Sequence, residues 1–230
     1  MIVGGVDVGS ATGKAVVMKD GEIIGSDMIA ATTRPQETAR LVMEAAVRQA
    51  GLPSIAHLDH IIGTGYGRLK IPFAQENVSE ISGHARGAHW LAPTTRTVVD
   101  IGGQDCKVIS VTEKGTVLNF AMNDRCAAGT GRFFEAMARV LYCGLEGISS
   151  LENQGENPCV ISNQCSVFAE SEVVTLLNEG TDLPSIIAGI NASVASRLNS
   201  MVRRVGLVKD LVLTGGCSKN DGLAKALAAK

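Results

Sequence analysis

The sequence predicts an α/β fold in which one order of strands and helices occurs twice. The composition is the first observation: of 230 residues, 45% are hydrophobic, only 3% are aromatic and 26 are glycine. Such a chain is typical of aliphatic layers joined by tight turns. The second observation is a strand that ends in an Asp-x-Gly turn and is followed by two more strands, a pattern that begins at residue 2 and again at residue 97. The length suits one large domain or two small lobes.

Each half of the pattern supplies its own strands and helices. The first half predicts strands over 2–8, 15–18, 22–29 and 61–63 and helices over 35–50 and 81–91. The second predicts strands over 97–101, 108–111, 117–122 and 211–213 and helices over 131–141, 167–178, 185–205 and 223–229. We therefore place an N-terminal lobe at 1–93 and a C-terminal lobe at 94–230. No closing strand follows the last helix, which leaves open whether the natural chain continues past residue 230.

Charge and hydropathy exclude several classes of protein. The net charge is −2 and the pI is about 6.1, so nucleic acid is not an expected partner. No apolar run reaches the roughly 18 residues that cross a membrane, and the N-terminus reads as a buried strand rather than a signal peptide. We expect a cytoplasmic protein that does not bind membranes. Its six cysteines are then thiols, metal ligands or core residues rather than disulfides.

Three glycine-containing turns follow predicted strands, at residues 7–14, 100–105 and 214–220. Glycines let the backbone approach a ligand, and exposed N–H groups with a lysine hold phosphate. The first two turns are predicted to bind phosphate, and the third is predicted to carry adenosine. Asp7 and Asp100 are expected to hold Mg²⁺, and Gln104 or Asp105 to orient the attacking water. The expected nucleotide and Mg²⁺ contacts are Asp7, Gly9, Ser10, Thr12, Lys14, Asp100, Gly102, Gly103, Gly129, Thr130, Gly215 and Gly216.

A single glycine-rich turn is more often only a turn, but three in this order point to a nucleotide. Neither the GxxxxGK[ST] nor the GxGxxG pattern follows the first strand. The spacing resembles the superfamily of actin, sugar kinases and heat-shock chaperones. That resemblance implies two ribonuclease H-like lobes with ATP in the cleft between them.

Two of the cysteines, Cys126 and Cys165, each precede a predicted helix. The positive end of a helix favours a thiolate or an anionic cluster. Because an iron–sulfur cluster usually needs four thiolates, two per chain make half of a site, and a two-fold dimer would complete it. An isolated cysteine is usually an ordinary core residue, which is how we interpret Cys106 and Cys217.

The motifs DVGSATGK, GTGYGR, DIGGQD, NDRCAAGTGRF, CSVFAESEVV and VLTGG span residues 7 to 216. Together they resemble the activator component of 2-hydroxyacyl-CoA dehydratases and the related ATPase subunits of benzoyl-CoA reductase. The resemblance implies a homodimer with one [4Fe-4S] cluster held by Cys126 and Cys165 of both subunits, and ATP or ADP in each subunit. It also implies ferredoxin or flavodoxin as electron donor, sensitivity to oxygen, and a dehydratase or reductase as acceptor. Two questions stay open: which acyl-CoA the partner enzyme acts on, and whether this protein dissociates from its partner or is a permanent subunit of it.

The predicted function is therefore ATP hydrolysis coupled to low-potential electron transfer. We also expect the backbone N–H groups of residues 129–131 to sense the γ-phosphate, because they follow Cys126 closely. One alternative is a small-molecule or carboxylate kinase of the same superfamily without a cluster. Another is a nucleotide-sensing or filament-forming module with slow hydrolysis and no redox activity.

Overall fold

The structure is a computed structural model that describes residues 1–123 and 126–230 and divides into two compact units, Met1–Gly83 and His84–Lys230. Asp124 and Arg125, which belong to one of the motifs above, lie outside the described residues. The division falls inside α2 (Glu80–Leu91), whereas the sequence placed it at residues 93 and 94. The second half of α2 contacts the second unit, since Thr95 Oγ1 donates to Ala88 O (3.4 Å) and Arg86 donates to Lys114 O.

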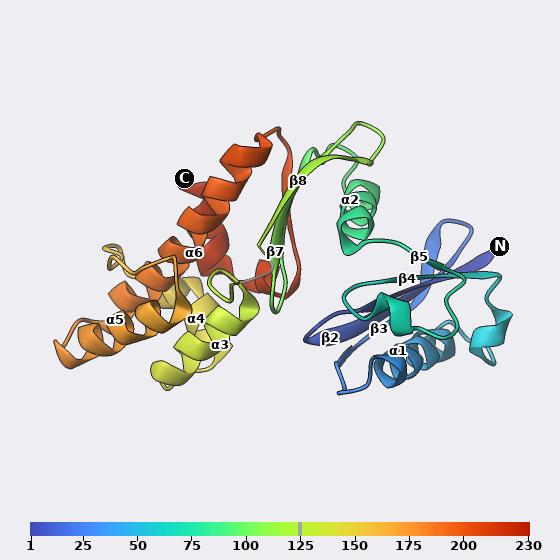
Figure 1. Cartoon of the computed structure of the whole chain (residues 1–230), viewed down its shortest axis with the longest axis horizontal. Helices are drawn as coiled ribbons and strands as arrows, with labels where there is room; N and C mark the ends of the chain where they lie inside the picture. The colour runs from blue at the N-terminus through green and yellow to red at the C-terminus, as the bar shows by residue number, and fades with distance from the viewer. Residues whose placement is uncertain (124–125) are drawn as a thin grey trace. The chain divides into compact units, whose positions relative to one another are not determined.

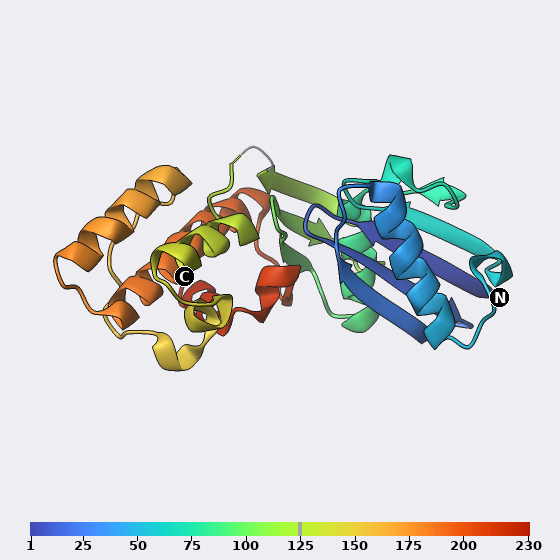
Figure 2. The same ribbon diagram turned by 90° about the horizontal axis from the view of Figure 1, so that it is seen from below.

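The first unit is a mixed sheet with one long helix on it. Its strands are β1 (Ile2–Val8), β2 (Thr12–Lys19), β3 (Glu22–Ala30), β4 (His60–Thr64) and β5 (Glu76–Asn77), in the order β3-β2-β1-β4-β5. β1 pairs antiparallel with β2 and parallel with β4. The helix α1 (Pro35–Gln49) lies along one face of this sheet (Figure 2) and buries Val42, Met43 and Ala46 against it. Short 3-10 turns occupy Ile55–His57 and Arg68–Lys70.

The second unit repeats this strand order. Its strands are β6 (Thr97–Ile101), β7 (Cys106–Val111), β8 (Val117–Asn123) and β9 (Leu211–Thr214), in the order β8-β7-β6-β9. β6 pairs antiparallel with β7 and parallel with β9. Every residue of β6 and β7 is buried, so this hairpin lies at the centre of the unit.

Helices cover one side of the second sheet (Figure 1). They are α3 (Gly131–Val140), α4 (Leu145–Ser149), α5 (Ser166–Asn178), α6 (Leu183–Val205) and α7 (Asp221–Ala228), with 3-10 turns at Leu151–Asn153 and Gly216–Lys219. Local signals explain α6: Asp182 accepts a hydrogen bond from Ser185 N, and Gly206 with φ +93° ends the helix. No helix among the described residues is long and apolar enough to span a membrane.

The expected duplication of topology is confirmed, and the strand register shows that it extends to individual residues. Asp7 at the end of β1 lies opposite Lys14 on β2, and Asp100 at the end of β6 lies opposite Lys107 on β7. β2 and β7 begin earlier than the sequence predicted, because their first residues already pair with the ends of β1 and β6. α4, β5 and the 3-10 turns were not predicted, since elements this short carry no periodic signal.

A buried amide cluster joins α6 to the segments around it. Asn191 is fully buried, and its Nδ2 donates to Ile148 O (3.0 Å) and to Gln154 Oε1 (2.9 Å). Its Oδ1 accepts from Asn220 Nδ2 (2.9 Å), and Asn220 caps α7 by accepting from Leu223 N. The position of the third turn therefore depends on α6.

We expect Asn191→Leu to destabilise the second unit by about 2–3 kcal/mol, because it leaves the buried amide of Asn220 and the half-buried amide oxygen of Gln154 without their partner. Ser200→Ala is the control: Ser200 is exposed on the same helix and bonds Ser196 O of its own helix. Urea unfolding of the full chain, followed by circular dichroism, measures the difference. Equal unfolding midpoints for both variants would contradict the structural importance of the cluster.

Candidate functional site

The first phosphate turn is closed by its own backbone. Gly9 N donates to Thr12 O (3.0 Å), and Lys14 Nζ pairs with Asp7 Oδ2 (2.9 Å). Gly65, with φ +87°, lies so close that a Cβ there would collide with the Asp7 carboxylate. The carboxylate is a quarter exposed and the lysine nearly half exposed. The turn thus presents a carboxylate and an ammonium group that solvent can still reach.

The second turn has the same geometry at the same spacing. Gly102 N donates to Asp105 O (2.9 Å), as Gly9 does to Thr12. Lys107 takes the place of Lys14, but it is buried, with Nζ 2.8 Å from Asp105 Oδ1 and 3.5 Å from Asp100 Oδ2. Lys107 was not predicted from the sequence. Its distance of seven residues from Asp100, which equals that of Lys14 from Asp7, was the signal that could have found it.

Asp100 is surrounded by polar groups inside the second unit. Its Oδ1 accepts from Thr214 Oγ1 (3.0 Å) and lies 3.4 Å from His84 Nε2. Only 3% of its side chain is exposed. The expected Mg²⁺ role of Asp100 stays a prediction. Of the two candidates for orienting water, Asp105 is engaged by Lys107, whereas Gln104 is exposed at the tip of the turn.

The third turn packs on the second. Gly215 has φ +82°, and a Cβ there would collide with Ile101 O and lie 2.7 Å from Asp100 Oδ1. Gly216 is exposed, and a Cβ there would meet nothing within 4 Å. Ser218 Oγ closes the turn by donating to Gly215 O (2.7 Å). One glycine is thus required by the fold, and its neighbour offers an open backbone surface.

The segment between Cys126 and α3 is bonded to the second turn. Gly131 N donates to Gly102 O and Arg132 N donates to Gly103 O, both at 2.9 Å. Thr130 is fully buried and turns back on its own segment, since its N and Oγ1 both donate to Ala127 O (3.1 and 2.7 Å). The N–H groups of residues 130 and 131 are therefore already bonded here. A direct contact between them and a γ-phosphate stays a prediction.

The two candidate cluster cysteines lie on neighbouring segments. Cys126 Sγ is 3.5 Å from Gln164 O, the carbonyl just before Cys165. Cys165 is the N-cap residue of α5, and both cysteines are free and half-buried. Among the described residues, no group of three or more His, Cys, Asp or Glu side chains could hold a metal ion. Cys165 thus lies at a helix start as predicted, whereas Cys126 lies five residues before α3, which begins at Gly131. Two half-buried free thiols on neighbouring segments fit half of a four-thiolate cluster.

Two of the other cysteines, Cys106 and Cys217, differ from this pair. Cys106 is buried with Sγ 3.7 Å from Met201 Sδ, and burial raises the pKa of its thiol. Burial, followed by the negative charge of Asp100, raises the pKa of Cys217 to about 12. Both therefore carry neutral thiols at physiological pH. Cys106 is buried, as expected for a core residue, whereas Cys217 is half-buried and packs against the edge of the core.

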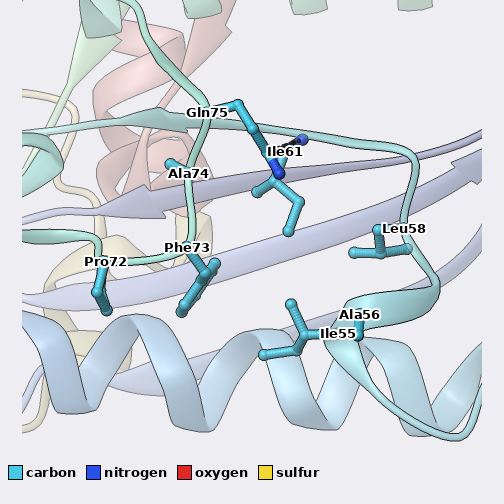
Figure 3. Close-up of a pocket in the computed structure, with 8 residues that line it drawn as sticks. All are labelled: Ile55, Ala56, Leu58, Ile61, Pro72, Phe73, Ala74 and Gln75. Atoms are coloured by element: carbon cyan, nitrogen blue, oxygen red, sulfur yellow. Dashed lines mark hydrogen bonds between the residues drawn. The ribbon is translucent and has the colours of Figure 1, made fainter.

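A pocket of about 530 Å³ lies elsewhere, in the first unit (Figure 3). It is lined mainly by apolar side chains such as Ile55, Leu58 and Phe73, and Gln75 uses its Oε1 to accept from Ile61 N (2.7 Å). None of the predicted site residues within the described part of the chain lines this pocket. An apolar pocket of this kind lacks the charges that phosphate needs.

Comparison with known families shows which class of protein carries turns of this kind. The model of the BadF/BadG/BcrA/BcrD ATPase family matches residues 5–230. The chain belongs to this ATPase family. Among its relatives, the activator of lactoyl-CoA dehydratase from Anaerotignum propionicum is 45% identical over 97% of the chain and 86% of the relative. The 2-hydroxyisocaproyl-CoA dehydratase activator from Clostridioides difficile is 41% identical over 97% of the chain and 84% of the relative. A benzoyl-CoA reductase component from Thauera aromatica is 34% identical over 97% of the chain and 82% of the relative.

Solved structures of ATPases in this family agree with the fold. Component A of (R)-2-hydroxyglutaryl-CoA dehydratase from Acidaminococcus fermentans superimposes with a TM-score of 0.94 at 42% identity, covering 100% of this chain and 88% of that one. The activator of 2-hydroxyisocaproyl-CoA dehydratase from Clostridium difficile, with bound ADPNP, gives 0.92 at 40%, covering 100% and 85%. A glucokinase from Streptomyces griseus shares the fold alone, with 0.56 at 12%, covering 100% and 88%. The family resemblance and the two-lobe ATPase fold predicted from the sequence are confirmed.

We expect Gly215→Ala and Gly216→Ala to separate folding from binding. Gly215→Ala destabilises the second unit by at least about 1–2 kcal/mol, because it forces a side chain into the left-handed region. Gly216→Ala unfolds as the wild type does, but it weakens ATP-analogue binding by about tenfold if adenosine lies on this backbone, a change of about 1.4 kcal/mol. Thermal unfolding and calorimetric titration measure both. Wild-type affinity in Gly216→Ala would place the adenosine elsewhere.

The raised pKa of Cys217 predicts slow alkylation. A thiol whose pKa lies near 12 instead of the ordinary 9.0 is almost entirely protonated at pH 8, and labelling accelerates only as the pH rises toward that value. We expect iodoacetamide at pH 8 to modify Cys217 at least about a hundredfold more slowly in the folded chain than in urea. Mass spectrometry of the peptide that contains Cys217 measures this. Equal rates would show that the third turn opens in solution.

Proposed function

We propose that this ATPase couples ATP hydrolysis to the transfer of an electron through a [4Fe-4S] cluster, which Cys126 and Cys165 of two copies hold together. The acceptor is a 2-hydroxyacyl-CoA dehydratase or a benzoyl-CoA reductase-type component. The observation that supports this most directly is one path of contacts. The second phosphate turn is bonded to the start of α3, and the segment just before α3 brings Cys126 against the segment of Cys165.

In this proposal the phosphate turns bind and orient ATP. Lys14 offsets the phosphate charge, and Asp7 and Asp100 hold Mg²⁺, directly or through water. Gln104 orients the attacking water, because Asp105 is engaged by Lys107. Phosphoryl transfer depends mainly on such positioning and on charge stabilisation, so no strong base is required.

Hydrolysis reaches the cysteines through the backbone. When the Gly102-Gly103 turn shifts on loss of the γ-phosphate, the N–H groups of Gly131 and Arg132 must follow or break their bonds to it. The movement is transmitted to Cys126, which lies five residues before Gly131 on the same segment. The cluster, when bound, supplies low-potential one-electron transfer whose potential responds to its surroundings.

The surface beside Cys165 favours a homodimer. Val167 and Phe168 in the first turn of α5 are 64% and 66% exposed. Large apolar side chains exposed beside a half-complete cluster site are the kind of surface that a second copy covers. Ferredoxin or flavodoxin is the proposed donor, and oxygen sensitivity follows from thiolates that remain partly accessible.

The test is iron and acid-labile sulfide after anaerobic purification, for the wild type, Cys126→Ser, Cys165→Ser and the control Cys143→Ser. We expect about four of each per dimer in the wild type and the control, and loss in the other two variants. Cys143 is a suitable control because it is also a half-buried free thiol. Iron-free wild type that still hydrolyses ATP would refute electron transfer and leave the kinase as the leading alternative.

A further inference from the structure

Arg197, in the middle of α6, contacts both cysteine segments at once. Its Nη1 donates to Asn163 O (2.6 Å), two residues before Cys165, and its Nη2 donates to Asn123 Oδ1 (3.2 Å). Asn123 in turn donates through Nδ2 to Cys126 O (3.1 Å) and Ala128 O (3.4 Å). One guanidinium group therefore joins segments that are far apart in the sequence.

Arg197 also contacts the segment that leads to the nucleotide turn. Gly129 has φ +87°, and a Cβ there would lie 2.9 Å from Arg197 Cδ. The aliphatic part of the arginine thus packs against the backbone between Cys126 and α3. The partners of Arg197 are consequently the two cysteine segments and the segment that is bonded to Gly102 and Gly103.

The second cysteine segment is fixed to the same body of the protein. Ser162 N donates to Glu172 Oε2 (2.6 Å), and Ser162 O accepts from Ser193 Oγ (3.1 Å), which is on α6. α6 is largely buried and provides a rigid support. From α6, Arg197 reaches both segments with two diverging donors, whereas a lysine would offer one charged group for two acceptors.

We infer that Arg197 is a positioning residue that holds the Cys126 and Cys165 segments at the spacing the cluster requires and couples that spacing to the nucleotide turn. The link to a cluster rests on the proposed function. The role of Arg197 in holding the two segments does not, because its hydrogen bonds to them are present without a cluster. The positive charge also favours the more reduced, more negatively charged cluster. Loss of the arginine should therefore loosen both segments and lower the midpoint potential.

The first test uses cluster-free protein, so that it stands even if no cluster binds. Hydrogen–deuterium exchange is compared at residues 126–131 and 163–166 in the wild type, Arg197→Met, Arg197→Lys and Arg204→Met. Arg204 is the matched control, an exposed arginine in the last turn of the same helix. We expect both segments of Arg197→Met to exchange at least about tenfold faster, given the strength of charged hydrogen bonds. Arg204→Met should match the wild type and Arg197→Lys should be intermediate.

The second test uses the reconstituted dimer. Arg197→Met should release iron to a chelator about tenfold faster than Arg204→Met and show a more negative midpoint potential, because a positive charge near the cluster is lost. Arg197→Lys keeps this charge and should keep a potential nearer that of the wild type. Asn123→Ala should loosen the Cys126 segment alone, because Asn123 bonds Cys126 O and Ala128 O. Adding it to Arg197→Met should accelerate exchange there by less than the product of the two single effects, since both variants lose the contact between Arg197 and Asn123. If Arg197→Met fails to fold, Arg197→Lys and Asn123→Ala decide the question.

The outcomes separate the two proposals. Unchanged exchange in both segments of Arg197→Met, or acceleration in one segment only, would overturn the role of Arg197 whether or not iron is present. Wild-type protein without iron would refute the cluster while leaving the exchange result valid for the two segments. An unchanged midpoint potential alongside faster exchange would remove the electrostatic part of the inference.

Discussion

The proposed coupling in the second unit depends on two backbone hydrogen bonds, from Gly131 N to Gly102 O and from Arg132 N to Gly103 O. They join the start of a helix to a turn that closes on itself through Gly102 N and Asp105 O. Backbone bonds of this kind do not depend on side-chain rotamers, so a shift of the turn is transmitted directly. A Cβ on Gly131 would lie 3.2 Å from Gly103 Cα, which shows how little space separates the two segments.

Much of this arrangement could be predicted from the sequence, because its signals are local. The strands that lead to Asp7 and Asp100 are short apolar runs that end in glycine turns. Such a run followed by glycine is enough to predict where a strand ends and a turn begins. The helix start after Cys165 could be predicted in the same way, and the structure makes Cys165 the N-cap residue of α5. The duplication followed from finding the same local order twice. The strand register, which places Asp7 opposite Lys14 and Asp100 opposite Lys107, could not be predicted directly. In the sequence it appears only as the same seven-residue spacing between Asp and Lys in both halves.

The parts that could not be predicted depend on contacts between distant segments. Arg197 lies in an ordinary helical pattern, and nothing near it in the sequence indicates Asn123 or Asn163 as partners. His84 likewise meets Asp100 only because α2 crosses the division between the units. The sequence pattern placed that division at the end of α2, where a loop begins, but packing on the second unit starts at His84. Periodicity locates helices well but does not show which unit each half of a helix contacts.

The two lysines opposite the two aspartates have diverged in a way that bears on mechanism. Lys14 is nearly half exposed, whereas Lys107 is 2% exposed and lies between Asp100 and Asp105. A buried ammonium between two carboxylates is held in place, because leaving either partner would strand a charge. Lys107 therefore gives the second turn a fixed shape, and Lys14 remains free to move. This difference suits the proposed mechanism, in which Lys14 follows a phosphate and the second turn transmits its displacement to α3 and Cys126. A flexible second turn would absorb that displacement instead.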